Sequence, residues 1–341
     1  VPIVGNGAAR VIGARVRDLR ADGRLLARAQ VEAWRRFRYD GVRIFTDLYV
    51  LAEAMGAGVA CPEDETAYLA APAIADPADV DRLRVPDPRA SPVLAASLEG
   101  LRVALDEIGG EVPVTGALTG PFTNASFLVG ADRIARLTLK APRAVHRLCE
   151  LSLEAAVGLA DAMLDLGAAP SVTDAMSSCS VISPRAFREF SQPYLQRLFG
   201  HIHARGKRAT LHVCGDTRQI WDAMVETGAD CLSIDNDVDL SEAKRRVGAR
   251  VRLMGNVRPS AVMLQGTPAD VRRAVLDCVE RAWDSPRGYT VASGCSLPTE
   301  TPLANIDAMM DAVREIGFPV LPDRLARLRA AWGPVETVPA P

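Results

Sequence analysis

The stretch RATLHVCGDTRQIWDAMVETGADCLSI, residues 208–234, decides the predicted fold of this chain. Residues 208–213 form a short apolar run that predicts a buried strand, residues 217–227 predict a helix, and residues 231–234 predict another buried strand. Short apolar strands that alternate with longer helices are typical of parallel β-α-β units. This one unit therefore predicts an α/β fold.

The same alternation runs along the whole chain of 341 residues. Seven predicted strands lie at residues 42–45, 112–118, 171–174, 208–213, 231–234, 251–254 and 289–293. The predicted helices lie at residues 26–38, 132–166 (two stretches broken near Ala141-Pro142), 217–227, 268–284 and 302–316, with another that Ser183-Pro184 opens. We predict one domain over residues 1–341, a (β/α)8 TIM barrel with its eighth strand unassigned. An N-terminal helical extension is expected over about residues 1–40 and a flexible tail over about residues 334–341.

Composition excludes several classes of protein. The formal net charge is −2 and the basic residues are dispersed, so no nucleic-acid surface is predicted. No apolar run approaches the roughly 18 residues that a membrane helix needs, because Glu53 interrupts the best one, residues 50–61. Seven scattered cysteines in a long chain indicate free thiols in a reducing compartment, and residues 1–10 show no signal-peptide pattern. We therefore expect a cytoplasmic protein without membrane or nucleic-acid partners.

Soft metal ligands stand at the ends of two distant predicted strands, as His212-Val213-Cys214 and as Cys295. A His-x-Cys pair on a strand points both side chains to one face, which suits a pair of ligands and also a packed core. Three protein ligands with an open position are typical of a catalytic zinc ion, whereas structural sites have four. Asp235, at the end of the next strand, is the candidate for a displaceable fourth ligand, and water is the alternative. Cys231, early in its strand, is expected to be a buried structural thiol.

Other polar residues also follow predicted strands. In a barrel, the carboxyl ends of the strands form the site. Asp47 and Asp174 are expected either to orient a substrate or to bond neighbouring backbone N–H groups. The candidates for substrate binding are Asp47, Thr119, Asp174, Asn256 and Arg258.

Short blocks in a fixed order give the chain a family resemblance. It resembles the uroporphyrinogen decarboxylase superfamily over nearly its whole length. The blocks are Ala52-Glu53-Ala54-Met55-Gly56, Gly116-Ala117-Leu118-Thr119-Gly120-Pro121-Phe122, Ile182-Ser183-Pro184, Gln192-Pro193-Tyr194, His212-Val213-Cys214-Gly215, Ser233-Ile234-Asp235, Gly255-Asn256, Gly266-Thr267-Pro268 and Ser293-Gly294-Cys295.

Within this superfamily the chain looks like the corrinoid-dependent methyltransferase branch. In that branch the set matching His212, Cys214 and Cys295 binds zinc. The true decarboxylases instead carry an N-terminal Met-Arg-Gln-Ala-Gly-Arg-like segment, whose arginines hold substrate carboxylates, and residues 1–20 contain no counterpart.

The resemblance implies a reaction and a partner. A zinc-dependent methyltransferase would move a methyl group from a methyl-Co(III) corrinoid to an acceptor, either a thiol such as coenzyme M or tetrahydrofolate. It implies no catalytic residue beyond the zinc-bound acceptor. The chain has no Asp-x-His-x-x-Gly motif, so the corrinoid is expected on a separate corrinoid-binding protein.

One position departs from the family pattern and leaves the acceptor open. Many relatives have Gly-Asn-x-Asp-Pro where this chain has Gly255-Asn256-Val257-Arg258-Pro259, so Arg258 replaces an acid. Arg258 would bind an anionic acceptor or partner, or be merely exposed. Two alternative functions are a metal-free decarboxylase of a uroporphyrinogen-like acid and a non-catalytic component of a methyltransferase or O-demethylase system.

Overall fold

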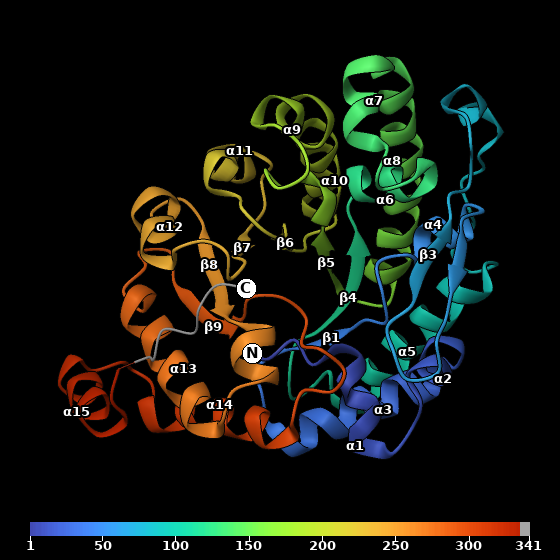
Figure 1. Cartoon of the computed structure of the whole chain (residues 1–341). Coiled ribbons are helices and arrows are strands. Elements are labelled where there is room, and N and C mark those ends of the chain that lie inside the picture. The colour runs from blue at the N-terminus through green and yellow to red at the C-terminus, as the bar shows by residue number, and fades with distance from the viewer. Residues whose placement is uncertain (335–341) are drawn as a thin grey trace.

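The computed structural model describes residues 1–334, and its centre is a parallel sheet of seven strands. Figure 1 shows the sheet curling around the middle of the molecule, with long helices on the outside. The strand order is β1-β4-β5-β6-β7-β8-β9, and every neighbouring pair is parallel. The strands are β1 (Val42–Ile44), β4 (Val114–Thr119), β5 (Ala169–Thr173), β6 (Thr210–His212), β7 (Cys231–Ser233), β8 (Arg252–Val257) and β9 (Tyr289–Ser293). All seven predicted strands are confirmed.

The eighth strand of a closed barrel is not found among the described residues, so the TIM-barrel prediction holds only for the curled parallel sheet. β1 and β9 are the two edges of that sheet. Ile3 lies beside β9 instead: its N–H donates to Ser293 Oγ (3.0 Å), and its carbonyl accepts from Leu297 N–H (2.9 Å). Pro2 has no N–H to donate, and the chain coils into a 3₁₀ turn at Gly5–Ala8, so no ladder continues here.

Helices cover the outside of the sheet and fill the N-terminal extension. The predicted break at Ala141-Pro142 is confirmed, since α7 ends at Lys140 and α8 begins at Pro142. The helices are α1 (Ala9–Ile12), α2 (Val16–Ala21), α3 (Gly23–Phe37), α4 (Val50–Ala54), α5 (Pro92–Ile108), α6 (Pro121–Val129), α7 (Ile134–Lys140), α8 (Pro142–Asp165), α9 (Pro184–Phe190), α10 (Gln192–Ala204), α11 (Trp221–Glu226), α12 (Leu240–Val247), α13 (Pro268–Ala282), α14 (Leu303–Ile316) and α15 (Pro322–Trp332). A separate antiparallel pair, β2 (Gly58–Ala60) and β3 (Tyr68–Ala71), follows α4.

Local capping fixes where several helices begin. Ser183 Oγ accepts from the Ala186 N–H at the start of α9, which confirms the predicted N-cap. Thr267 and Asp270 form a reciprocal capping box on α13. The predicted tail at about residues 334–341 lies almost entirely outside the described residues, and the single-domain boundary stays a prediction. Within residues 1–334, no helix is both long and apolar enough to cross a bilayer.

Side chains alternate along the strands, so the sheet has an apolar outer face and a polar inner face. Leu211, Leu232 and Leu253 lie in register on three adjacent strands and are fully buried in the core. Their neighbours Thr210 and Cys231 point to the other face. That face borders a cavity of about 670 Å³, which extends from the amino-terminal ends of the strands up to His212. Bulky branched side chains usually fill a barrel interior, so the small polar residues explain the space.

Candidate metal centre

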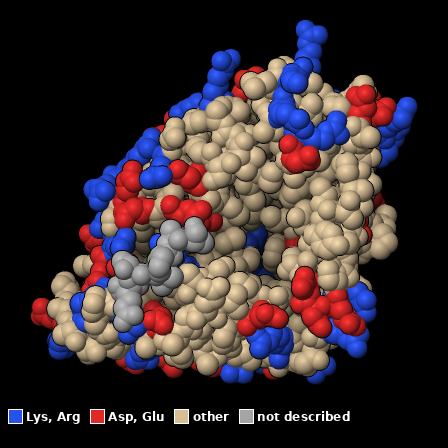
Figure 2. Space-filling model, in the orientation of Figure 1, with Lys and Arg blue, Asp and Glu red and all other residues tan. Residues whose placement is uncertain are grey.

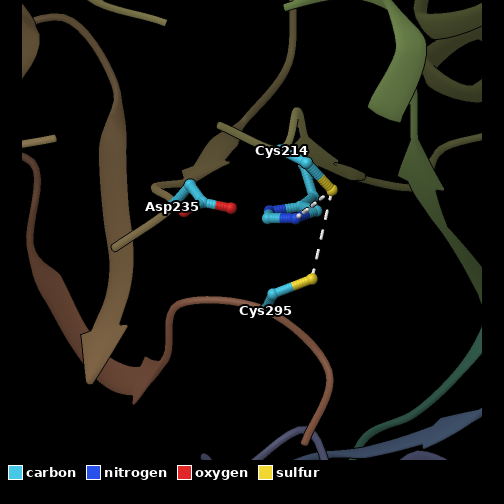
Figure 3. A group of neighbouring side chains, drawn as sticks. Cys214, Asp235 and Cys295 are labelled. Atoms are coloured by element: carbon cyan, nitrogen blue, oxygen red, sulfur yellow. Dashed lines mark hydrogen bonds between the residues drawn. The ribbon is translucent and has the colours of Figure 1, made fainter. Parts of the chain in front are cut away.

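Four side chains with metal-binding donor atoms meet at the carboxyl ends of the strands. His212 ends β6, Cys214 follows it, Asp235 follows β7, and Cys295 follows β9. One donor atom from each lies within 4.8 Å of the donor atoms of the other three. Cys214 Sγ is 3.3 Å from His212 Nε2 and 4.0 Å from Cys295 Sγ. Figure 3 shows Cys214, Asp235 and Cys295 pointing toward one shared space.

The spacing of these donor atoms fits a tetrahedral zinc ion. With Zn–S bonds of about 2.3 Å and Zn–N bonds of about 2.0 Å, tetrahedral angles separate two sulfurs by roughly 3.8 Å and a sulfur from a nitrogen by roughly 3.5 Å. The observed separations are 4.0 Å and 3.3 Å. Thiolate, imidazole and carboxylate are also the usual zinc donors. The structure thus brings together all four predicted ligands, while metal binding itself stays a prediction.

Hydrogen bonds and glycines hold the donors in place. The Nδ1 atom of His212 lies 3.1 Å from the Ser233 carbonyl oxygen, which orients Nε2 toward the cluster. Gly215, directly after Cys214, has a φ of +71°, a conformation that glycine adopts without strain. A Cβ at Gly294 would lie 2.8 Å from the Asn236 backbone nitrogen, so glycine allows the Cys295 loop to approach the loop after β7.

The two thiols and the imidazole influence one another's protonation. The hydrogen bond with Cys295 and burial raise the pKa of Cys214, since its ionisation would place two negative charges side by side. The hydrogen bond from Cys214, reinforced by His212, lowers the pKa of Cys295 to about 4. Burial alone would lower the pKa of His212, but the hydrogen bond and charge of Cys295 raise it. Burial raises the pKa of Asp235. Such a concentration of acidic groups is stabilised by a bound cation.

Two other predicted site residues, Asp47 and Thr119, form hydrogen bonds with neighbouring groups of the protein. Asp47 accepts from Arg20 Nε (2.7 Å) and from the Tyr49 N–H (2.8 Å). Thr119 Oγ1 donates to the Leu48 carbonyl oxygen at 2.8 Å. These contacts hold the loop after β1, and the substrate-binding roles of Asp47 and Thr119 stay predictions.

Asp174 connects three elements beneath the site. It is fully buried, with Oδ1 accepting from the Thr123 N–H (2.8 Å) and Oδ2 accepting from Ser191 Oγ (2.6 Å). Of the two roles considered for Asp174, bonding to a backbone N–H is the one whose contacts are present. The carboxylate thereby ties the end of β5 to α6 and to the segment that opens α10.

The two candidates on the β8 side differ in their surroundings. Asn256 Nδ2 donates to the carbonyl oxygens of Asp235 and Val238, both at 2.9 Å, so it braces the loop that carries Asp235. Arg258 is exposed at the end of β8. Its role toward an acceptor or partner stays a prediction.

Sequence reasoning missed Arg43, and its expectation for Cys231 is confirmed only in part. Arg43 lies in the middle of β1, borders the same cavity as His212, and donates from Nη2 to Thr173 Oγ1 at 2.8 Å. A charged residue inside the apolar run 42–45 was the available signal. Cys231 is only partly buried and also borders the cavity, and it lies outside the cluster of four donors.

Residues 3–316 match the family model described as uroporphyrinogen decarboxylase (URO-D). The chain therefore belongs to the uroporphyrinogen decarboxylase family, which confirms the resemblance inferred from its motifs. It is 28% identical over 312 residues to a methylcobamide:CoM methyltransferase MtaA of Methanosarcina barkeri, covering 88% of this chain and 87% of that protein. It is also 28% identical over 304 residues to a uroporphyrinogen decarboxylase of Psychromonas ingrahamii, covering 86% of this chain and 84% of that protein.

A solved structure shares the fold over nearly its whole length. The methyltransferase from Methanosarcina mazei superimposes with a TM-score of 0.83 at 25% identity, covering 92% of this chain and 93% of that one. The sequence relatives thus include methyltransferases and decarboxylases at equal identity. They support an enzyme, and the chemistry of the site has to decide between the two reactions.

Proposed function

We propose that this chain is a zinc-dependent methyltransferase. It moves a methyl group between a methyl-Co(III) corrinoid, carried by a partner protein, and a small acceptor such as a coenzyme M-like thiol or tetrahydrofolate. The observation that carries this proposal is the convergence of His212, Cys214, Asp235 and Cys295 within 4.8 Å. The similarity to a methylcobamide:CoM methyltransferase and to a solved methyltransferase supports it.

The four side chains have distinct proposed roles. A zinc ion bound here would supply Lewis acidity, lowering the pKa of an incoming thiol so that it reacts as a thiolate. Cys214 and Cys295 contribute two negative charges, which keep the bound group electron-rich. His212 presents Nε2 because Ser233 fixes its other nitrogen. Asp235 completes the set, with water as the alternative fourth donor.

A decarboxylase of a uroporphyrinogen-like acid would need cationic side chains to bind its substrate. The several carboxylates of a uroporphyrinogen-like acid need several free cations near the site. Arg20, the last arginine of residues 1–20, already pairs with Asp47 and Glu53. This pairing favours the methyltransferase, and the third possibility, a non-catalytic component, predicts the metal without turnover.

The test combines metal analysis with two assays on the purified protein. Zinc per chain is measured, free methylcobalamin demethylation is followed by absorbance with acceptors added one at a time, and uroporphyrinogen decarboxylation is assayed in parallel. We expect about one zinc per chain and acceptor-dependent demethylation. Both are expected to be lost in Cys214→Ser and kept in the matched control Cys231→Ser. Metal-free protein that decarboxylates uroporphyrinogen would overturn the proposal. Zinc without turnover, even with a corrinoid-binding protein added, would favour the non-catalytic role.

A further inference from the structure

Arg43 is a cation on the inner face of the sheet without an acidic partner. No carboxylate of the described residues lies within 4.0 Å of it, unlike most arginines of this chain. Its guanidinium donates from Nη2 to Thr173 Oγ1 (2.8 Å) and, at 3.4 Å, to the Ser171 carbonyl oxygen. Its Nε is buried and has no hydrogen-bond partner among residues 1–334. A partly buried guanidinium without a carboxylate partner is costly, so this group is suited to an anionic partner.

The position of Arg43 connects it to the metal centre. Thr173, which holds its guanidinium, pairs in register with His212 on the adjacent strand. Arg43 and His212 border the same cavity of about 670 Å³. Figure 2 shows a hollow in the middle of the molecule with Lys or Arg atoms visible inside it. Arg43 therefore lines the same space as one of the four predicted ligands.

The guanidinium is held in a fixed orientation and stays charged. Its Cζ lies 5.0 Å from the centre of the Phe45 ring, a cation–π distance. Burial lowers the pKa of Arg43 to about 10, and the thiols of Cys295 and Cys214 act in the opposite direction. Arg43 is thus a cation at neutral pH. Because both hydrogen bonds come from Nη2, the N–H groups of Nη1 stay available to donate to a carboxylate or sulfonate.

We propose that Arg43 selects the charge of the acceptor. It binds the carboxylate or sulfonate of a small anionic acceptor whose nucleophilic atom lies at the metal centre, and a neutral acceptor lacks this contact. The inference rests on the proposed function and adds to it a residue that determines specificity. In the competing account, Arg43 merely offsets the negative charge of the cysteine ligands, so that its removal weakens zinc binding and leaves the acceptor preference unchanged.

The first test measures binding without chemistry. Ethanesulfonate and propionate, with neutral 1-propanol as the control ligand, are titrated against the full chain by ligand-observed NMR. The proteins are wild type, Arg43→Met, the charge-preserving Arg43→Lys, and Arg252→Met, which removes an arginine at the amino-terminal end of the same cavity. We expect both anions, and not propanol, to bind the wild type and Arg252→Met. Arg43→Met should bind them about 10 to 100 times more weakly, and Arg43→Lys should lie in between. Equal anion binding by wild type and Arg43→Met would overturn the proposal.

The second test measures turnover and metal together. Free methylcobalamin is demethylated with 2-mercaptoethanesulfonate, 3-mercaptopropionate or neutral 2-mercaptoethanol as the acceptor. Arg43→Met should lower kcat/KM for the two anionic thiols about 10 to 100-fold, mainly through KM, with little change for the neutral thiol and no change in zinc content. An equal loss for all three thiols, or loss of zinc, would support the competing account instead. If wild type methylates no thiol yet binds both anions through Arg43, the proposed function fails and the anion site stands.

Discussion

Replacing Cys295 by serine is the sharpest test of the metal centre. The substitution removes one sulfur and keeps nearly the same shape. A serine hydroxyl stays protonated near neutral pH and is a poor zinc ligand, whereas the pKa of Cys295 is already lowered to about 4 by its hydrogen bonds with Cys214 and His212. The Cys295→Ser protein should therefore fold normally and bind zinc weakly.

The donor set gives the size of this effect. Zinc sites with four protein ligands have binding free energies of about 10–16 kcal/mol, so one of four donors accounts for roughly 2.5–4 kcal/mol. Each 1.4 kcal/mol changes an equilibrium constant about tenfold, so the dissociation constant should rise about 10²- to 10³-fold. Because Cys214 loses its sulfur neighbour at 4.0 Å, the pKa of Cys214 should also fall toward its ordinary value.

Competition with a chromogenic chelator measures this change at equilibrium. The matched control is Cys231→Ser, the same substitution on the wall of the cavity and outside the donor cluster. We expect the control to bind zinc like the wild type. An unchanged affinity in Cys295→Ser, or the same loss in both variants, would refute the assignment of Cys295 as a ligand.

Three further predictions concern the surroundings of the site. Burial raises the pKa of Asp174, so the native state loses stability as the pH rises from the unfolded pKa, about 3.9, through the native one. Asp174→Asn should gain stability relative to wild type as the pH rises above about 4 in thermal unfolding, and parallel pH curves would contradict this. Gly294→Ala puts a Cβ 2.8 Å from the Asn236 backbone nitrogen, so zinc affinity should fall about tenfold in the chelator assay, with unchanged affinity as the contrary result. Arg20→Met leaves Asp47 buried without its cation, and urea unfolding should show a loss of about 3 kcal/mol; a loss below about 1 kcal/mol would show that the pair is dispensable.

The sequence by itself determined the strands and the set of candidate ligands. Apolar runs of a few residues between longer helices depend only on local patterning, which is why all seven strands lie where they were predicted. The predicted ligands His212 and Cys214 point to the same side because side chains alternate along extended backbone, so their proximity required no knowledge of the remaining chain. The ends of parallel strands meet at one edge of a sheet, and this rule placed Asp235 and Cys295 beside them.

Only the tertiary structure decided which polar side chains form hydrogen bonds or salt bridges within the protein and which do not. The fully buried Asp174 accepts hydrogen bonds from Thr123 and Ser191, and its local sequence predicts neither partner. Arg43 and Thr173 are 130 positions apart, and their contact depends on how the sheet curls around the cavity. The open edge between β1 and β9 likewise follows from the path of the first residues past Ser293. Such contacts depend on the packing of distant segments, whereas local sequence patterns depend only on neighbouring residues.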